Sequence, residues 1–225
     1  MVVGTAYRET ILSGDDSACG LYLVVKPGPA APERLAAALA VAPVACLLIE
    51  PAGEAEAASD ARPLVELAQE RGVAVLVNRD VHLAQALAAD GVHLPWSKQL
   101  LKEFEEARGV LGTQSIVGIH AGKSRHDAML LAEQGADYIG FGLPAEVRDR
   151  TAGAARRLEL VAWWSEIFIV PCVAFDADTP GEAQALAAAG ADFVACGLPA
   201  GVKPAAGADH VVAIYRAVST AQRLP

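Results

Sequence analysis

Short apolar runs alternate with longer amphipathic stretches along the chain from Gly20 onward. The runs place Val, Ile, Leu and Ala at consecutive positions, which is typical of strands buried on both faces. The stretches between them have apolar residues at helical spacing and end near a turn residue such as Gly72. The pattern predicts strands at residues 21–25, 44–49, 73–77, 91–94, 115–119, 137–141, 169–175 and 192–196.

One stretch of this pattern occurs twice. Residues 132–147 read AEQGADYIGFGLPAEV, and residues 187–202 read AAAGADFVACGLPAGV. In each copy an Ala-rich helix end stops at a glycine, Gly135 or Gly190, which suits the left-handed position past a helix. A short apolar strand follows, and Gly-Leu-Pro-Ala leads out of it. The repeat indicates a recurring α/β unit, and we expect any ligand at the strand-exit loops.

Eight strands, each followed by a helix, predict a single (β/α)8 TIM barrel with a parallel eight-stranded core. A doubly wound open sheet is the alternative, and it would want a glycine-rich fingerprint after the first strand. The sequence there is Lys26-Pro-Gly-Pro29, in which the prolines remove the amide donors that such a loop uses. Residues 1–19 are predicted to form an N-terminal arm or capping helix, and residues 20–225 the barrel domain.

Composition narrows the classes of partner. The chain has 225 residues, 53% of them hydrophobic and 20% charged, which fits one globular barrel. The net charge of −9 disfavours nucleic acid as a partner, and no apolar run reaches the length of a membrane span. No signal peptide is recognisable. The cysteines (Cys19, Cys46, Cys172 and Cys196) have no CxxC spacing and are expected to be reduced, which favours a cytoplasmic location.

Several segments resemble a known family in order and at compatible spacing. Residues 72–97 read GVAVLVNRDVHLAQALAADGVHLPWS. They resemble the third- and fourth-strand region of thiamine phosphate synthases and their regulator-like relatives, where an Asn-Asp-Arg strand exit precedes Gly-Val-His-Leu-Gly-Gln. The likeness continues through IVGIHAGKSRHDAMLLAEQGADYIGFG at 116–142 and TPGEAQALAAAGADFVA at 179–195. It covers most of the chain from Gly20 onward.

The resemblance implies an activity and a cofactor. In that family the enzyme joins hydroxymethylpyrimidine diphosphate to thiazole phosphate and releases pyrophosphate with the help of magnesium. The asparagine after the third strand corresponds to Asn78, but the two acids that bind magnesium fall on Arg79 and Lys98. Magnesium takes oxygen ligands and gains nothing from a cation. Magnesium is therefore the family cofactor but is not expected here, and we predict no metal ligands.

The positions that handle phosphate in the family are also changed. Glu50 stands where the resemblance implies a cationic grip on the diphosphate. His120 replaces a serine after the fifth strand, and Gly142 opens a Gly-Leu-Pro-Ala turn in place of Gly-Pro-Val-Phe. The Gly-Gly-Ile expected after the seventh strand reads Asp176-Ala-Asp178, and carboxylates there repel phosphate. The candidate ligand-binding residues are therefore Glu50, Asn78, Arg79, Lys98, His120, Gly142 and Asp176.

Some of these positions also have a plainer interpretation. Arg79 and Lys98 could neutralise a diphosphate or a carboxylate directly, or they could form salt bridges with neighbours such as Asp80 or Glu50. Asp176 and Asp178 could hold a cation together with a histidine, although helix-start chemistry explains Asp178 as well.

Three further features have the same ambiguity. His93 lies in a strand, where a core histidine is favoured over a catalytic one. The Arg148–Arg150 run lies in a loop predicted at residues 145–155, before a helix at 158–168, and is either solvated or in contact with an anion. Trp163 and Trp164 are predicted to pack on an outer helix, with a homo-oligomer interface as their other use.

Three functions remain open from the sequence. The first is a thiamine-phosphate-synthase-like barrel that has lost the family reaction and survives as a binding or regulatory protein, or with altered chemistry. The second is an active synthase with a rearranged site, in which Arg79, Lys98 and His120 take the place of magnesium. The third is an unrelated small-phosphate barrel enzyme. All three imply a small, anionic ligand as partner, and none allows a catalytic residue to be assigned.

Overall fold

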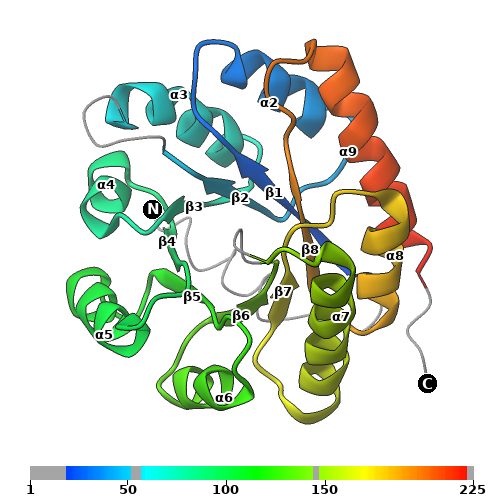
Figure 1. Cartoon of the computed structure of the whole chain (residues 1–225). Helices are drawn as coiled ribbons and strands as arrows, with labels where there is room; N and C mark the ends of the chain where they lie inside the picture. The colour runs from blue at the N-terminus through cyan, green and yellow to red at the C-terminus, as the bar shows by residue number, and fades with distance from the viewer. Residues whose placement is uncertain (1–18, 52–56, 144–146, 222–225) are drawn as a thin grey trace.

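The strands of the computed structural model close into one parallel barrel, in chain order from β1 to β8, as Figure 1 shows. The structure describes residues 19–51, 57–143 and 147–221. The predicted (β/α)8 fold is confirmed. All but residue 19 of the predicted N-terminal arm lies outside the described residues. The strands are β1 (Gly20–Val25), β2 (Cys46–Ile49), β3 (Ala74–Asn78), β4 (Gly91–Leu94), β5 (Ile116–His120), β6 (Tyr138–Phe141), β7 (Cys172–Ala174) and β8 (Phe193–Gly197).

A helix follows each strand and packs on the outside of the barrel (Figure 1). The helices are α2 (Ala31–Leu39), α3 (Ala57–Gln69), α4 (Val81–Leu87), α5 (Leu100–Leu111), α6 (Arg125–Glu133), α7 (Arg150–Ile167), α8 (Pro180–Ala188) and α9 (Pro204–Ser219). None of the helices in the described ranges combines the length and the hydropathy that a membrane span requires.

Two boundaries around α7 differ from the sequence prediction. The arginine-rich segment belongs largely to the helix, which begins at Arg150 because the Asp149 carboxylate accepts a hydrogen bond from the Ala152 amide at 3.0 Å. The loop predicted at residues 145–155 is therefore wrong in its second half. Strand β7 is shorter than predicted, since Ile169 is fully exposed.

Apolar side chains fill the barrel interior as well as the layer between strands and helices. The interior cluster includes Tyr22, Cys46, Leu76, Tyr138 and Phe193. Gly118 makes room for the Tyr138 ring, because a Cβ at position 118 would lie 2.0 Å from that ring. The interior is thus a packed core, so a ligand has to be held at the rim rather than within the barrel.

Three aspartates join neighbouring strands at the amino end of the barrel. Asp90, Asp137 and Asp192 each precede an even-numbered strand. Their carboxylates accept hydrogen bonds from the amides of Val75, Val117 and Cys172, at 2.7, 2.8 and 2.8 Å. Asp137 and Asp192 are equivalent positions of the duplicated sequence. The repeat therefore encodes a cross-strand contact at the face opposite the strand-exit loops.

Candidate functional site

Three of the predicted site residues meet at the carboxyl ends of β5, β6 and β7. His120 is the last residue of β5, while Gly142 and Asp176 lie one and two residues past the ends of β6 and β7. A Cβ added at Gly142 would lie 2.6 Å from His120 Nε2 and 2.8 Å from Asp176 Oδ2. Only a glycine leaves space for both side chains, so the three positions form one polar centre at the rim.

Asp176 is held in a strained backbone conformation. Its φ of 62° is in the left-handed region that favours glycine. Its Oδ2 accepts a hydrogen bond from the Leu143 amide at 2.7 Å, and its carbonyl oxygen accepts one from Arg157 Nη1 at 2.6 Å. A backbone amide at a strand exit is a group that could bind an anionic ligand. Here the Asp176 carboxylate already accepts the hydrogen bond of the Leu143 amide.

His120 presents a defined nitrogen to this centre. Its Nδ1 accepts a hydrogen bond from the Gly122 amide at 3.1 Å. In the neutral ring the proton is therefore on Nε2, the nitrogen that faces Gly142 and Asp176. A donor at this position suits a carboxylate or another anion.

A hydrogen-bonded chain lies below His120 in the barrel interior. The rings of His120 and His93 are 6.4 Å apart between centroids, and His93 Nδ1 lies 2.8 Å from the Tyr138 hydroxyl. That hydroxyl lies 2.9 Å from the hydroxyl of Tyr22. Burial, followed by the proximity of His120, lowers the pKa of His93 to about 3. His93 is therefore a neutral core histidine at pH 7, as the sequence predicted.

Glu50 lies in the electrostatic field of the same centre. Its side chain is half-buried, and burial raises its pKa, with Asp176 adding to the increase and Lys26 opposing it. The carboxylates of Glu50, after β2, and Asp176, after β7, therefore make the rim acidic at these two exits. A phosphate would be repelled there, whereas a ligand with a hydrogen-bond donor would not.

Arg79, Asn78 and Lys98 form a second part of the rim. Arg79 and Lys98 are exposed, and among the described ranges neither pairs with a carboxylate. The predicted pairing with Asp80 is not formed, because that carboxylate caps α4 through the Leu83 amide at 2.8 Å. Arg79 has a φ of 66°. Asn78 Oδ1 is buried and has no hydrogen-bond partner in the described part of the chain.

The comparisons with known proteins agree with this architecture. A family model described as thiamine monophosphate synthase matches residues 21–197. The chain belongs to the thiamine monophosphate synthase family. A thiamine-phosphate synthase of Rhodospirillum centenum is 39% identical over 188 residues, which are 80% of this chain and 88% of that protein.

Two other members of the thiamine monophosphate synthase family match over a shorter stretch. The thiamine-phosphate synthase of Erythrobacter litoralis is 43% identical over 62% of this chain, and that of Hyphomonas neptunium 44% identical over 57%. The matches span 65% and 57% of those two proteins, less than two thirds of each. Thiamine phosphate pyrophosphorylase from Pyrococcus furiosus has the same fold, with a TM-score of 0.71 at 21% identity over 88% of this chain and 95% of that one.

Magnesium, the cofactor implied by the family resemblance, does not fit the donors at this rim. The two motif positions for its acids carry the exposed cations Arg79 and Lys98, and the buried side-chain oxygen of Asn78 supplies only one ligand atom. Within residues 19–51, 57–143 and 147–221, no three His, Cys, Asp or Glu side chains gather closely enough to hold a metal ion. A hard divalent cation requires several oxygen ligands.

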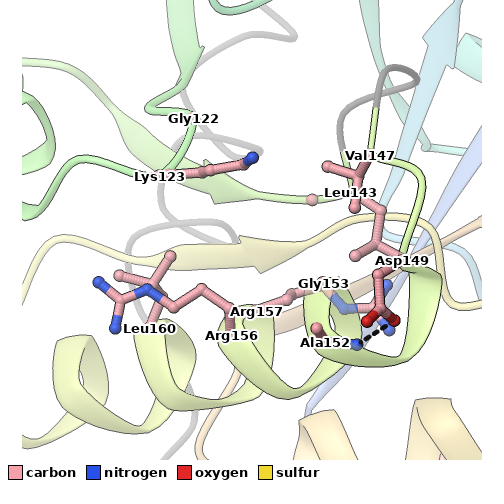
Figure 2. A pocket seen from close by; sticks show the side chains of 11 residues that line it. Gly122, Lys123, Leu143, Val147, Asp149, Ala152, Gly153, Arg156, Arg157 and Leu160 are labelled. Carbon is pink, nitrogen blue, oxygen red and sulfur yellow. Dashed lines mark hydrogen bonds between the residues drawn. The ribbon is translucent and has the colours of Figure 1, made fainter.

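A pocket opens beside the polar centre, between the β5 and β6 exits and the first turns of α7 (Figure 2). Its volume is about 230 Å³. Arg157, which lines it, is 2% exposed and donates to the carbonyls of Phe175 and Asp176 at 2.6 Å each. This role could not be predicted from the sequence, because a single arginine in a helix indicates no particular acceptor. The lining residues are Gly122, Lys123, Gly142, Leu143, Val147, Asp149, Ala152, Gly153, Arg156, Arg157 and Leu160.

Proposed function

We propose that this family member binds a small anionic ligand at its strand exits and does not catalyse the magnesium-dependent coupling of pyrimidine diphosphate and thiazole phosphate. The observation that carries the proposal is the Asp176 carboxylate, which accepts the Leu143 amide at 2.7 Å. A carboxylate in that place fills a backbone anion site and repels a phosphate that approaches it.

The charges around the rim support the same conclusion. Arg79 and Lys98 offer cationic donors at the β3 and β4 exits, while Glu50 at the β2 exit and Asp176 at the β7 exit contribute negative charge. A ligand with one anionic group and one donor group would match this division. The family reaction instead needs two phosphorylated substrates, a pyrimidine diphosphate and a thiazole phosphate. One of their phosphate groups would lie next to a carboxylate.

The test combines turnover with binding. Purified protein is given the two family substrates with magnesium, next to the Rhodospirillum centenum relative prepared in the same way. We expect no thiamine phosphate above background from this chain. Thiamine phosphate and its pyrimidine and thiazole fragments are then titrated calorimetrically. A ligand found in this way is expected to bind about tenfold more weakly to Arg79→Ala or Lys98→Ala, since each removes a charge-assisted hydrogen bond.

Lys102→Ala is the matched control, because Lys102 is an exposed lysine on α5, paired with Glu106 at 3.5 Å. Its affinity is expected to stay within twofold of the parent protein. Turnover comparable to that of the relative would contradict the proposal.

Active catalysis with a rearranged site is the second candidate. It is favoured by the 39% identity to a protein named as a thiamine-phosphate synthase and by the protonated Nε2 of His120 at the rim. Here Arg79 and Lys98 would neutralise the diphosphate directly. The candidate requires that the chain restores growth of a thiamine auxotroph and that Arg79→Ala abolishes this growth. Soluble protein without complementation would exclude it.

A further inference from the structure

The pocket borders the polar centre at Gly142 and Leu143 and has charged and apolar walls of its own beyond them. One wall comes from the turn after β5, with Gly122 and Lys123, and another from the first three turns of α7. Figure 2 shows Lys123 extending from the β5 side toward Leu143 and Val147. The candidate residues Arg79, Lys98 and Glu50 are not among its lining residues.

Cations outnumber anions around this pocket. Lys123, Arg156 and Arg157 line it, against the single carboxylate of Asp149. Among the described residues, Lys123 forms no ion pair. Arg156 Nη1 forms one with Glu159 Oε2 at 3.0 Å. The Asp149 carboxylate also accepts a hydrogen bond from the Ala152 amide at 3.0 Å. Because Glu159 and Glu182 pair with the two arginines, the Lys123 ammonium is the charge that an anionic ligand group would neutralise.

Arg157 supplies an independent sign that a polar partner is missing. Its two terminal nitrogens are engaged, Nη1 by the carbonyls of Phe175 and Asp176 and Nη2 by Glu182 at 3.4 Å. Its Nε is buried and has no hydrogen-bond partner in the part of the chain that the structure describes. Buried donors are normally satisfied, so this unpaired Nε marks an unfilled hydrogen-bonding position in a residue that lines the pocket.

The remaining walls are apolar and the space is large enough for a ring. Leu143, Val147 and Leu160 contribute the aliphatic surface. An apolar cavity of roughly 150 Å³ holds benzene, and this pocket measures about 230 Å³. A six-membered ring with one small anionic group therefore fits.

We infer that this pocket binds a small aromatic carboxylate, with the ring against Leu143, Val147 and Leu160 and the carboxylate between Lys123 and the arginines of α7. A singly charged head group is favoured over a phosphate because Asp149 is present at the pocket wall and would repel a dianion. The inference rests on Lys123, Val147 and Leu160, which the proposed function does not use, although the two sites share Gly142 and Leu143.

The probe is benzoate, titrated into the ¹⁵N-labelled full chain and followed by amide chemical shifts. We expect saturable shifts that are largest for the amides of Gly122, Gly142 and Gly153, which line the pocket. Lys123→Met is expected to weaken binding about tenfold, because it removes a charge-assisted contact. Lys102→Met, on α5, serves as the matched lysine control and should stay within twofold.

A blocking variant gives a second readout. A Cβ at Gly153 would lie 3.0 Å from Leu143 Cδ2 and Val147 Cγ1, so a larger side chain there enters the pocket. Gly153→Leu is expected to abolish the benzoate shifts while the rest of the amide spectrum stays dispersed and folded. Arg79→Ala should leave benzoate binding unchanged, which separates this pocket from the strand-exit site.

Ligand controls decide the chemical class. Benzyl alcohol has the ring without the charge, and acetate has the charge without the ring; both are expected to bind at least tenfold more weakly than benzoate. The inference is overturned if Lys123→Met and Gly153→Leu bind benzoate like the parent chain, or if the shifts lie away from α7. Binding of phenyl phosphate more than tenfold tighter than benzoate would overturn the assignment to a carboxylate.

Discussion

Asp176 is the residue at which the strand-exit site of this protein departs most from a phosphate-binding loop. Its backbone adopts a conformation that suits glycine, with φ at 62°, and its carboxylate reaches back to the Leu143 amide. A non-glycine residue in this region costs roughly 1–2 kcal/mol. Arg157 offsets that cost by donating hydrogen bonds to the carbonyl oxygens of Phe175 and Asp176.

Asp176→Gly is expected to create phosphate affinity. The substitution removes a negative charge, frees the Leu143 amide and lets the backbone approach a ligand more closely. Relief of strain and loss of the hydrogen bond act in opposite directions, so the free energy of unfolding should change by no more than about 1 kcal/mol. Calorimetric titration with inorganic phosphate measures the gain. Equal phosphate affinity in the variant and the parent would show that the carboxylate does not block the site.

His93 makes stability depend on pH. Its folded-state pKa is about 3, below the ordinary value of 6.5, because the ring is buried. Between pH 6.5 and 3 the unfolded chain takes up a proton that the folded chain does not. The contribution of His93 to the free energy of unfolding therefore falls as pH is lowered, by about 1.4 kcal/mol per pH unit. Urea unfolding of the parent and of His93→Gln at pH 7.5, 6.5, 5.5 and 4.5 measures it; parallel curves for the two proteins would contradict it.

At the scale of elements, the three aspartates at the amino end tie the strands together in pairs. Each joins the strand after it to the strand before it in the chain: β4 to β3, β6 to β5 and β8 to β7. Asp137 is the most buried of the three and also accepts from Arg108 at 2.6 Å. Its removal leaves both the guanidinium and the Val117 amide without this acceptor.

Asp137→Ala is expected to lower the free energy of unfolding by about 3 kcal/mol, because breaking one side of a buried ion pair leaves the other charge uncompensated. Asp178→Ala is the control. Its carboxylate is 70% exposed and lies 3.7 Å from Arg150, so its loss should cost less than about 1 kcal/mol. Chemical denaturation of the two variants beside the parent makes the comparison. Similar losses in both would show that the buried contact has no special role.

At the scale of the whole molecule, the sequence predicts the barrel better than the site. Buried strands such as β3 and β5 are continuous apolar runs that local pattern alone reveals. The sequence predicts the start of α7 too late because a charged run resembles a loop, and only the Asp149 cap distinguishes the two. The contact from Asp176 to Leu143 could not be predicted, since it joins residues 33 positions apart that meet only when β6 and β7 pair.

Restoring the acids that the family resemblance implies at two rim positions is expected to leave the barrel intact. Arg79 and Lys98 are both exposed, and aspartate tolerates the left-handed backbone of residue 79. The double variant Arg79→Asp, Lys98→Asp should unfold within about 5 °C of the parent without metal, and magnesium should raise its melting temperature by mass action. Thermal unfolding with magnesium or with potassium at equal ionic strength is the measurement. A similar magnesium effect on the parent would contradict the expectation.

The three aspartate contacts have a consequence for how this barrel can change. They lie at the amino ends of the strands, opposite the exits that carry Arg79, Lys98 and Asp176. Substitutions at the exits therefore leave these contacts in place. A library randomised at the exits would retain mostly folded members and could be searched for new ligands. The same number of substitutions around Asp90, Asp137 and Asp192 would mainly produce unfolded chains.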